Sequence, residues 1–380
     1  MNSKTERGLF IGLSILLVIF VAIFVSRKHF SKEGTDITIG AILPMTGDLA
    51  SYAEPLKRGM DLAVHCINQQ GGIDGKNLRI VYEDDRGEAP TAVSAYRKLV
   101  DMDHVPMVIG GMFSASTFAI APLAEQEHIV ILSPTASAIE LTDAGDYIFR
   151  IYPSDIYDGA FLARFAWDTL GAKKVAIVYE QVASVVAIAD RFKSDFEAAG
   201  GEVAVYDGYR SDLNDFNSLV KKVKDAKPDV LFFPGNLTPM ANLLVQAKRM
   251  ALNTKLLTIS TFFDAKILEL TQNASEGVMF STPMFDPSDS SPEMIEFVKV
   301  YKEMYGIEPD ILGGYGYDVV RIAAEALGQG MTPDQIKKAL YAIEDFPGVT
   351  GRTTFDENGD VTKDLKMMAV KNGTFQPFEE

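Results

Sequence analysis

Short apolar runs alternate with amphipathic segments along the chain from residue 37 onward. The run 37–43 is apolar enough for a buried strand, and in the next segment apolar residues recur every three or four positions, as on one face of a helix. Pro55 predicts the first turn of this helix and Gly71 predicts its end, since proline suits a first helical position and glycine a position just past the last one. A strand–helix unit therefore opens this part of the chain.

The same unit then recurs in two sets. The first set predicts further strands at 78–82, 105–109 and 129–132, with helices at 92–100 and 116–126. The second set predicts strands at 174–179, 203–206, 230–233 and 256–259, separated by helices at 186–199, 215–225 and 240–250. Strands that alternate with helices indicate a parallel sheet covered on both faces. The pattern therefore predicts an α/β protein with two doubly wound parallel-sheet lobes.

The pattern changes after residue 283, where the chain becomes rich in Pro, Ser and Asp. Helices are predicted at 292–305 and 317–327. Residues 353–360 and 365–370 are predicted as short strands around a turn at Asn358-Gly359, a dipeptide typical of tight hairpins.

The overall composition fits two globular lobes and excludes several partners. The chain has 380 residues, 47% of them hydrophobic and 23% charged, which is more than one small domain and not a disordered composition. Its net charge of −16 would repel a phosphate backbone, so nucleic acid is not an expected partner. Cys66 is the only cysteine, which excludes an intramolecular disulfide.

The N-terminal residues 1–30 contain the most apolar stretch of the chain. Residues 9–25 carry no charge, and their number is close to the short end of the roughly 17–25 residues that span a bilayer. A cleaved signal peptide would end in small residues, but Phe20 and Phe24 occupy the relevant positions. We interpret residues 1–30 as an uncleaved transmembrane anchor, with a cleaved signal as the alternative. The anchor would tether the rest of the chain to the cytoplasmic membrane, but the charges that flank the segment do not fix its orientation.

Motifs typical of enzymes, metal sites and cofactor sites do not occur in usable form. A Gly-x-Ser-x-Gly sequence is absent, and residues 71–77 (GGIDGKN) deviate from a phosphate-binding loop in spacing and in their last residue. None of the four histidines lies at metal-ligand spacing from another. Residues 356–360 begin like a calcium loop but lack its glycine and its bidentate glutamate. We therefore expect no catalytic residue, no metal and no cofactor.

Hydroxyl-rich segments follow two predicted strands at the ends where ligands bind in parallel sheets. Residues 110–117 (GGMFSAST) follow one strand and open a helix, and residues 133–137 (SPTAS) follow the next strand. Glycines allow a ligand to approach the backbone, while hydroxyl groups and the free N–H groups of a helix start bind anions. Together the two segments predict a site for a small carboxylate-bearing ligand.

Three segments resemble one known family. They are ILPMTGDLASYAEPLKRGMDLAVHCINQQGGIDGKNLRIVYEDD, VIGGMFSASTFAIAPLAEQEHIVILSPTASAIELT and NASEGVMFSTPMFD. In this order and spacing they resemble the leucine/isoleucine/valine-binding proteins of ABC transporters, which have the type I periplasmic-binding fold. The resemblance implies two lobes joined by a hinge, the first formed by 37–152 plus 284–352 and the second by 153–283 plus 353–380. It implies crossings between the lobes near 151–155, 281–286 and 350–356.

The resemblance also implies ligand-binding residues. Ser114 would hold the ligand carboxylate, the backbone carbonyl of Thr135 would meet an ammonium group, and Ser137 would touch both. Tyr52 would flank the ligand side chain. The complete set of expected ligand-binding residues is Tyr52, Phe113, Ser114, Thr135, Ala136, Ser137, Ser184, Asn236 and Ser260.

The second lobe departs from the family pattern at three of these positions. Ser184 begins the pair that replaces Tyr-Gly, and Asn236 lies near the position of a tyrosine. Ser260 aligns with the acidic residue that pairs the ligand ammonium, and a buried ammonium without an anion costs several kcal/mol. Either another carboxylate such as Asp264 supplies the charge, or the ligand is not an α-amino acid. The neighbouring Phe262-Phe263 pair would suit an apolar ligand or pack in the core.

The expected function is therefore solute capture, not catalysis. The two lobes would close on a small amino acid or a related carboxylate or amide, and the closed form would dock on an ABC permease in the membrane. The same fold also serves as the ligand-sensing domain of signalling receptors, which is the alternative.

Overall fold

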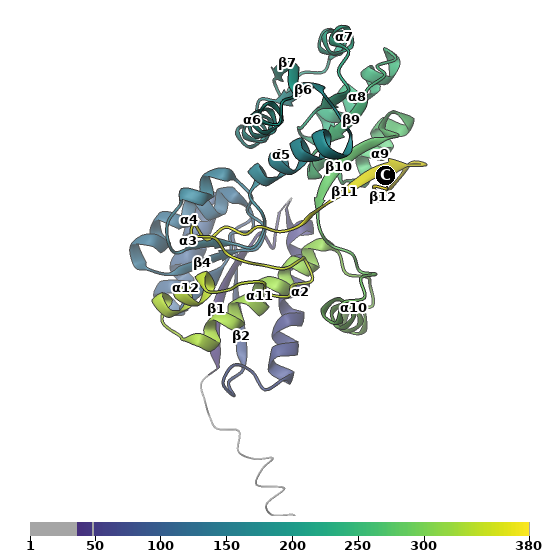
Figure 1. Cartoon of the computed structure of the whole chain (residues 1–380). Coiled ribbons are helices and arrows are strands. Elements are labelled where there is room, and N and C mark those ends of the chain that lie inside the picture. The colour runs from purple at the N-terminus through teal and green to yellow at the C-terminus, as the bar shows by residue number, and fades with distance from the viewer. Residues whose placement is uncertain (1–35, 48, 380) are drawn as a thin grey trace, which may run out of the picture.

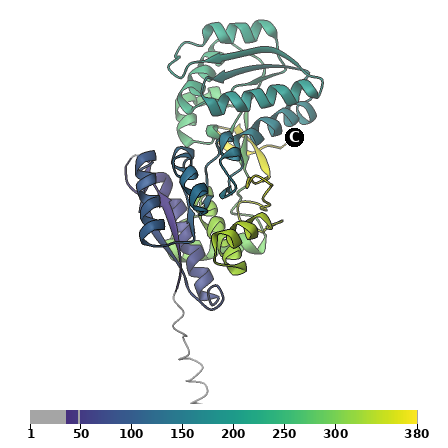
Figure 2. The same cartoon turned by 90° about the vertical axis from the view of Figure 1, so that its left-hand side faces the viewer.

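The computed structural model describes residues 36–47 and 49–379, which form two α/β lobes lying one above the other (Figures 1 and 2). The first lobe contains a parallel sheet of five strands in the order β2-β1-β3-β4-β5. These strands are β1 (Ile37–Leu43), β2 (Leu78–Asp84), β3 (Met107–Ile109), β4 (Val130–Ser133) and β5 (Ile148–Arg150). Its helices are α2 (Ala50–Gln69), α3 (Ala89–Arg97), α4 (Ser114–Glu127), α10 (Pro292–Tyr305), α11 (Ile311–Gln329) and α12 (Pro333–Tyr341).

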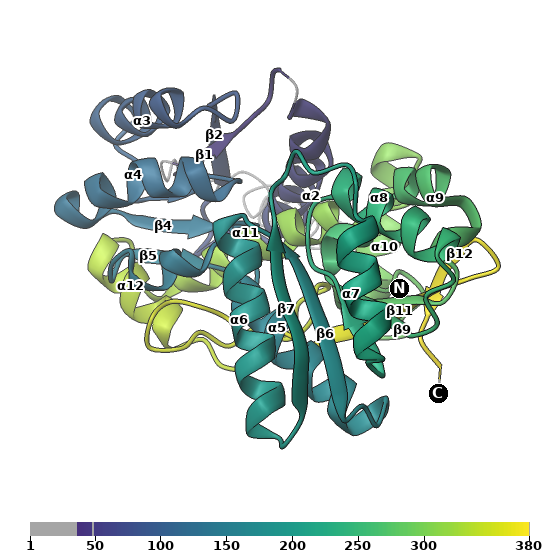
Figure 3. The same cartoon turned by 90° about the horizontal axis from the view of Figure 1, so that it is seen from above.

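The second lobe contains a sheet of seven strands in the order β12-β11-β10-β9-β8-β6-β7. They are β6 (Lys174–Glu180), β7 (Glu202–Tyr209), β8 (Val230–Phe232), β9 (Lys255–Thr258), β10 (Val278–Pro283), β11 (Leu365–Lys371) and β12 (Thr374–Pro377). The helices are α5 (Asp155–Arg164), α6 (Ala183–Ala198), α7 (Asn217–Ala226), α8 (Leu237–Arg249) and α9 (Ala265–Thr271). Helices α6 and α7 lie on opposite sides of β6 and β7 (Figure 3), so this sheet is covered on both faces as the alternating pattern predicts.

Each lobe has its own hydrophobic core. Strand β1 is mostly buried because its side chains meet helices on both faces of the sheet, and apolar residues of α2, α10 and α11 pack in the same cluster. Helices α2 and α11 approach closely at Gly59 and Gly316. A Cβ atom at Gly59 would lie 1.9 Å from the carbonyl oxygen of Gly313, so this crossing requires glycine.

Several predicted element bounds differ from those observed. Helix α2 begins at Ala50, and Pro55 lies inside it rather than in its first turn. The first turn of the helix, residues 50–54, therefore precedes this proline, which cannot donate a backbone hydrogen bond. The strand predicted at 353–360 is not formed, but Phe355 and Val361 form an isolated antiparallel bridge across the predicted turn at Asn358-Gly359. The strand predicted at 365–370 is confirmed as β11. The hairpin of the C-terminal region joins β11 to β12, and β11 pairs antiparallel with β10.

The segment before β11 packs with the first lobe, whereas the sequence placed residues 353–380 in the second lobe. Phe355 and Val361 lie in the core cluster of β1 and α2. The chain passes between the lobes after β5, after β10 and before β11, and we call these three connections the hinge. The second and third connections contact each other, since the backbone N–H of Met284 donates to the carbonyl oxygen of Asp364 at 3.2 Å.

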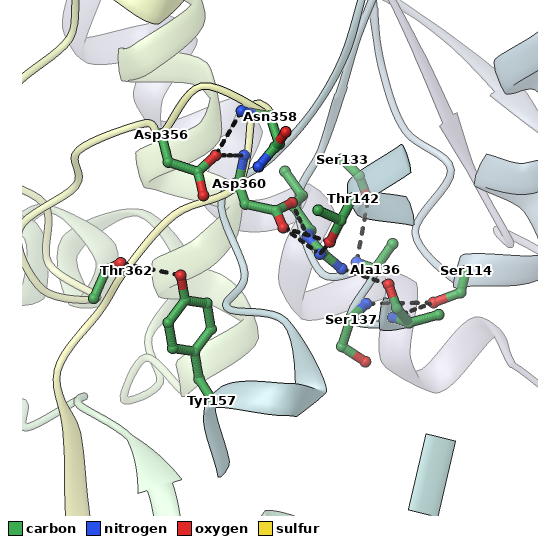
Figure 4. A network of polar contacts seen from close by, with 12 residues as sticks. Ser114, Ser133, Ala136, Ser137, Thr142, Tyr157, Asp356, Asn358, Asp360 and Thr362 are labelled. Carbon is green, nitrogen blue, oxygen red and sulfur yellow. Dashed lines mark hydrogen bonds and ion pairs between the residues drawn. The ribbon is translucent and has the colours of Figure 1, made fainter. Parts of the chain in front are cut away.

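Arg150 fixes this last segment to the first lobe at the end of β5. Its side chain is 2% exposed, and its Nε and Nη2 atoms donate to the two carboxylate oxygens of Asp360 at 2.6 and 2.7 Å. Nη1 donates to the carbonyl oxygen of Ala138 at 2.6 Å, and Nη2 also contacts Thr142. The contacts of Asp360 and Thr142 are shown in Figure 4. This buried pair therefore couples the hinge to the loop that contains Ala138.

The part of the chain that the structure describes contains no helix long and apolar enough to cross a membrane. The anchor predicted at residues 1–30 lies outside these residues, so it stays a prediction.

The buried position of Asp360 generates a stability prediction. Asp360→Asn removes the charge that balances the buried Arg150 guanidinium, and breaking a buried pair from one side costs about 3–5 kcal/mol. Urea unfolding of the variant should show a loss of this order. Asp345→Asn is the matched control because the Arg352–Asp345 pair is exposed, and it should leave the midpoint unchanged. Equal midpoints for both variants would contradict the role assigned to Asp360.

Candidate functional site

The loops that follow β3 and β4 are held together by hydroxyl groups donating to backbone carbonyls. Ser133 Oγ donates to the carbonyl oxygen of Gly111 at 2.8 Å, and Thr135 Oγ1 donates to that of Met112 at 2.7 Å. Ala136 is buried, and its N–H donates to Ser133 Oγ at 3.1 Å. Strands β3 and β4 are neighbours and parallel, so both loops emerge at the same edge of the sheet. The two predicted segments are therefore brought together in one place.

Ser114 is the first residue of α4 and lies between these loops. Its Oγ accepts hydrogen bonds from the N–H groups of Ser137 and Ala138, at 3.3 and 3.2 Å (Figure 4). No hydrogen bond among the described residues uses the Ser114 hydroxyl as a donor, so its proton is free for a ligand. The first N–H groups of a helix also have no intrahelical acceptor. This corner can therefore donate several hydrogen bonds to one carboxylate.

Two aromatic residues lie beside this donor group. Tyr52 on α2 is 50% exposed, and its ring lies edge-on to that of Phe113 with 6.2 Å between the centroids. Phe113 directly precedes Ser114 at the N-terminus of α4. The pair could contact the apolar part of a ligand whose polar end is held at Ser114.

The three expected residues of the second lobe also share one edge of a sheet. Ser184 lies in the first turn of α6, Asn236 precedes α8, and Ser260 opens a short 3-10 turn at residues 260–262. They follow β6, β8 and β9, which are adjacent and parallel. The structure thus groups them, although none of the three carries a charge.

The two alternatives weighed for the region after Ser260 have definite positions. The carboxylate of Asp264 is exposed and accepts the N–H of Lys266 at 2.7 Å, which caps α9. Phe262 is fully buried in the second-lobe core, while Phe263 is 47% exposed and packs on Phe375 at 5.0 Å between ring centroids. Asp264 therefore acts as a helix cap at the surface, and Phe262 is a core residue.

Asp155 and Asp158 were missed by the sequence analysis, although they lie in the first turn of α5 beside the hinge. Burial raises the pKa of Asp155 to about 7, against the opposing effects of a hydrogen bond from Ser137 and the charge of Arg150. Burial also raises the pKa of Asp158 to about 6, opposed by hydrogen bonds from Ser281 and Ser260. The Ser281 Oγ–Asp158 Oδ1 distance is 2.7 Å. The sequence signal that could have identified them is a pair of acidic residues three positions apart where the chain crosses between the lobes.

Metal binding has no support in the described ranges 36–47 and 49–379. They contain no cluster of three or more His, Cys, Asp or Glu side chains that could hold an ion.

Comparison with known proteins places the chain in a family. The family model described as periplasmic binding protein matches residues 36–374. The chain belongs to the periplasmic binding protein family. It is 29% identical to the leucine-, isoleucine-, valine-, threonine- and alanine-binding protein of Pseudomonas aeruginosa, over 92% of this chain and 94% of that protein.

Solved structures of similar proteins show the same fold. A leucine-binding protein from Thermotoga maritima has a TM-score of 0.75 and 28% identity, covering 90% of this chain and 98% of its own. An ABC transporter substrate-binding protein from Desulfitobacterium hafniense, in complex with leucine, has a TM-score of 0.78 and 26% identity and covers 90% and 100%. The fold is the type I periplasmic-binding fold expected from the sequence, and these relatives are solute-binding proteins rather than enzymes.

The raised pKa of Asp158 predicts how stability depends on pH. Because the pKa in the folded protein lies above that of a free aspartate, this group's contribution to stability is complete at low pH and is lost as the pH rises through about 6. Asp158→Asn has no charge to bury. Relative to the parent protein, the variant should therefore gain about 1 kcal/mol of unfolding free energy between pH 5 and pH 8. Urea unfolding without ligand at both pH values measures this difference, and a constant offset between the proteins would refute the prediction.

Proposed function

We propose that this chain is the extracytoplasmic solute-binding component of an ABC uptake transporter of the branched-chain amino acid class. The observation that carries the proposal is the donor group at Ser114, where an unused hydroxyl proton and the N-terminus of α4 converge. Such an arrangement recognises a carboxylate through charge-assisted hydrogen bonds. The ligand we propose is a small aliphatic α-amino acid.

The relatives support this ligand class. The similar protein of Pseudomonas aeruginosa is named for binding leucine, isoleucine, valine, threonine and alanine, and the Desulfitobacterium hafniense structure contains leucine. For this chain we propose that Ser114, Ser137 and the N–H groups beside them hold the carboxylate, with the Thr135 carbonyl oxygen and buried Ala136 completing this side. Tyr52 and Phe113 would contact the aliphatic side chain.

Binding would require the two lobes to close. The first lobe contributes the loops after β3 and β4, and the second lobe contributes the loops with Ser184, Asn236 and Ser260. A ligand that contacts both sets of loops favours the closed arrangement by its differential affinity for it. The closed protein would then dock on an ABC permease, which distinguishes loaded from empty protein by shape.

The N-terminal segment would keep the protein close to that permease. We propose that residues 1–30 form an uncleaved membrane anchor, since residues 9–25 are uncharged and apolar. Tethering raises the effective concentration of the binding protein at the permease without any new contact.

Removal of the Ser114 hydroxyl tests the carboxylate site. Ser114→Ala should weaken binding about 10–100-fold, because a hydrogen bond to a charged group contributes about 1.5–3 kcal/mol. Isothermal titration of the full-length chain with leucine, isoleucine, valine, threonine and alanine measures the loss. Ser94→Ala is the control, since Ser94 is exposed on α3 and bonds only to the carbonyl oxygen of Pro90. Failure of all five amino acids to bind the parent protein would overturn the proposed ligand class.

The anchor has a separate test. N-terminal sequencing of the protein isolated from membranes should begin at or near Met1. A sequence that begins near Ser26 would show that the segment is a cleaved signal and would contradict the anchor.

A further inference from the structure

We propose that Asp158 supplies the negative charge that pairs with the ammonium group of the ligand, in the place where Ser260 has none to offer. This inference rests on the proposed function, because it assumes an α-amino acid as ligand. It assigns the specificity for the amino group to the first turn of α5, a part of the chain that connects the two lobes.

Among the described residues, the groups that act on Asp158 are hydroxyls and none of them is a cation. Ser281 Oγ donates to its Oδ1 at 2.7 Å, and the hydroxyl of Ser260 also faces the carboxyl group. Its charged neighbour is Asp155, and Tyr152 lies nearby. None of the ion pairs between described residues includes Asp158. A carboxylate enclosed in this way is costly unless it meets a positive charge, which an ammonium group provides.

Asp155 connects this carboxylate to the proposed carboxylate site. Its N–H donates to the carbonyl oxygen of Ser137 at 2.9 Å, and the Ser137 hydroxyl lowers the pKa of its carboxyl group. Ser137 in turn donates its N–H to Ser114 Oγ. Residues three apart share one face of a helix, so Asp158 lies next to Asp155 along α5. Asp158 therefore lies one helical turn from the residue that contacts the donors for the carboxylate.

A second buried polar group at this turn lacks a partner. Ser154 precedes α5, is 2% exposed, and its Oγ makes no hydrogen bond. It lines a small cavity together with Asp155 and Asp158. Buried polar atoms are normally satisfied, so an unpaired hydroxyl beside two enclosed carboxyl groups indicates that the arrangement is completed by something other than the chain itself.

The other carboxylates of the second lobe that border the site are already engaged. Asp264 is exposed and caps α9. Glu180 is buried at the end of β6, but its Oε2 accepts the N–H of Asn236 at 2.6 Å, at the N-terminus of α8 where the helix dipole stabilises an anion. Asp155 has the charge of Arg150 beside it, so among these carboxylates Asp158 is the one without a cation nearby in the described part of the chain.

The experiment compares ligands with and without the amino group. Leucine is paired with 4-methylpentanoate and alanine with propanoate, and binding to the full-length chain is measured by isothermal titration at pH 8. The parent protein should prefer the amino acid of a pair. Asp158→Asn should weaken binding of the amino acid at least 30-fold and change binding of the carboxylic acid less than threefold. Asp264→Asn, the matched control, should change neither.

A second variant separates a charge effect from a local structural effect. The double variant D158N/S260E places a carboxylate at the neighbouring position 260. It should bind the amino acid at least tenfold more tightly than Asp158→Asn does. Unchanged leucine and alanine affinities in Asp158→Asn would overturn the inference while leaving the proposed function intact. A parent protein that binds the carboxylic acids but not the amino acids would overturn it too, with the carboxylate site preserved. If the parent protein bound none of these compounds, the proposed function itself would be contradicted.

Discussion

The two N–H···O hydrogen bonds that Ser114 Oγ accepts from Ser137 and Ala138 are the interaction on which the account of this site depends. In these bonds the Ser114 oxygen accepts from the protein, so the hydroxyl proton can be donated to a ligand. The loop that donates these bonds is itself held by Arg150, which binds the carbonyl oxygen of Ala138 and the carboxylate of Asp360. The buried Arg150–Asp360 ion pair at the hinge therefore positions the Ser114 hydroxyl, which we propose binds the ligand carboxylate.

The first turn of α5 joins this arrangement to the second lobe. Asp155 contacts Ser137 from the first lobe, and Asp158 contacts Ser281 and Ser260 from the second. Burial raises the pKa of both carboxyl groups, against the charge of Arg150 at Asp155 and with no cation beside Asp158 among the described residues. Burial of a carboxylate lowers the stability of the folded protein. Such groups are typical of functional sites, where a bound ligand can compensate for this loss of stability. The same turn thus links recognition of the ligand to the relative position of the lobes.

Much of the fold could be predicted because local sequence decides it. Strand β1 and helix α10 have the predicted bounds, since a mostly apolar run defines the first and a proline at the first helical position begins the second. Strand β10 was missed because Ser281, Thr282 and Pro283 interrupt its apolar character, although the whole strand is buried. Asp155 and Asp158 were missed for a related reason. Their spacing of three residues at a lobe crossing was the available signal, but the enclosure of Asp158 depends on Ser281, more than 100 positions away, which no local pattern reveals.

The most direct test of the account is a crystal structure of the full-length chain grown with leucine. The account predicts the ligand carboxylate at hydrogen-bond distance from Ser114 Oγ and the ammonium nitrogen facing Asp158, directly or through Ser260. A bound leucine with its carboxylate away from the start of α4, or with its ammonium paired to a different carboxylate, would contradict it.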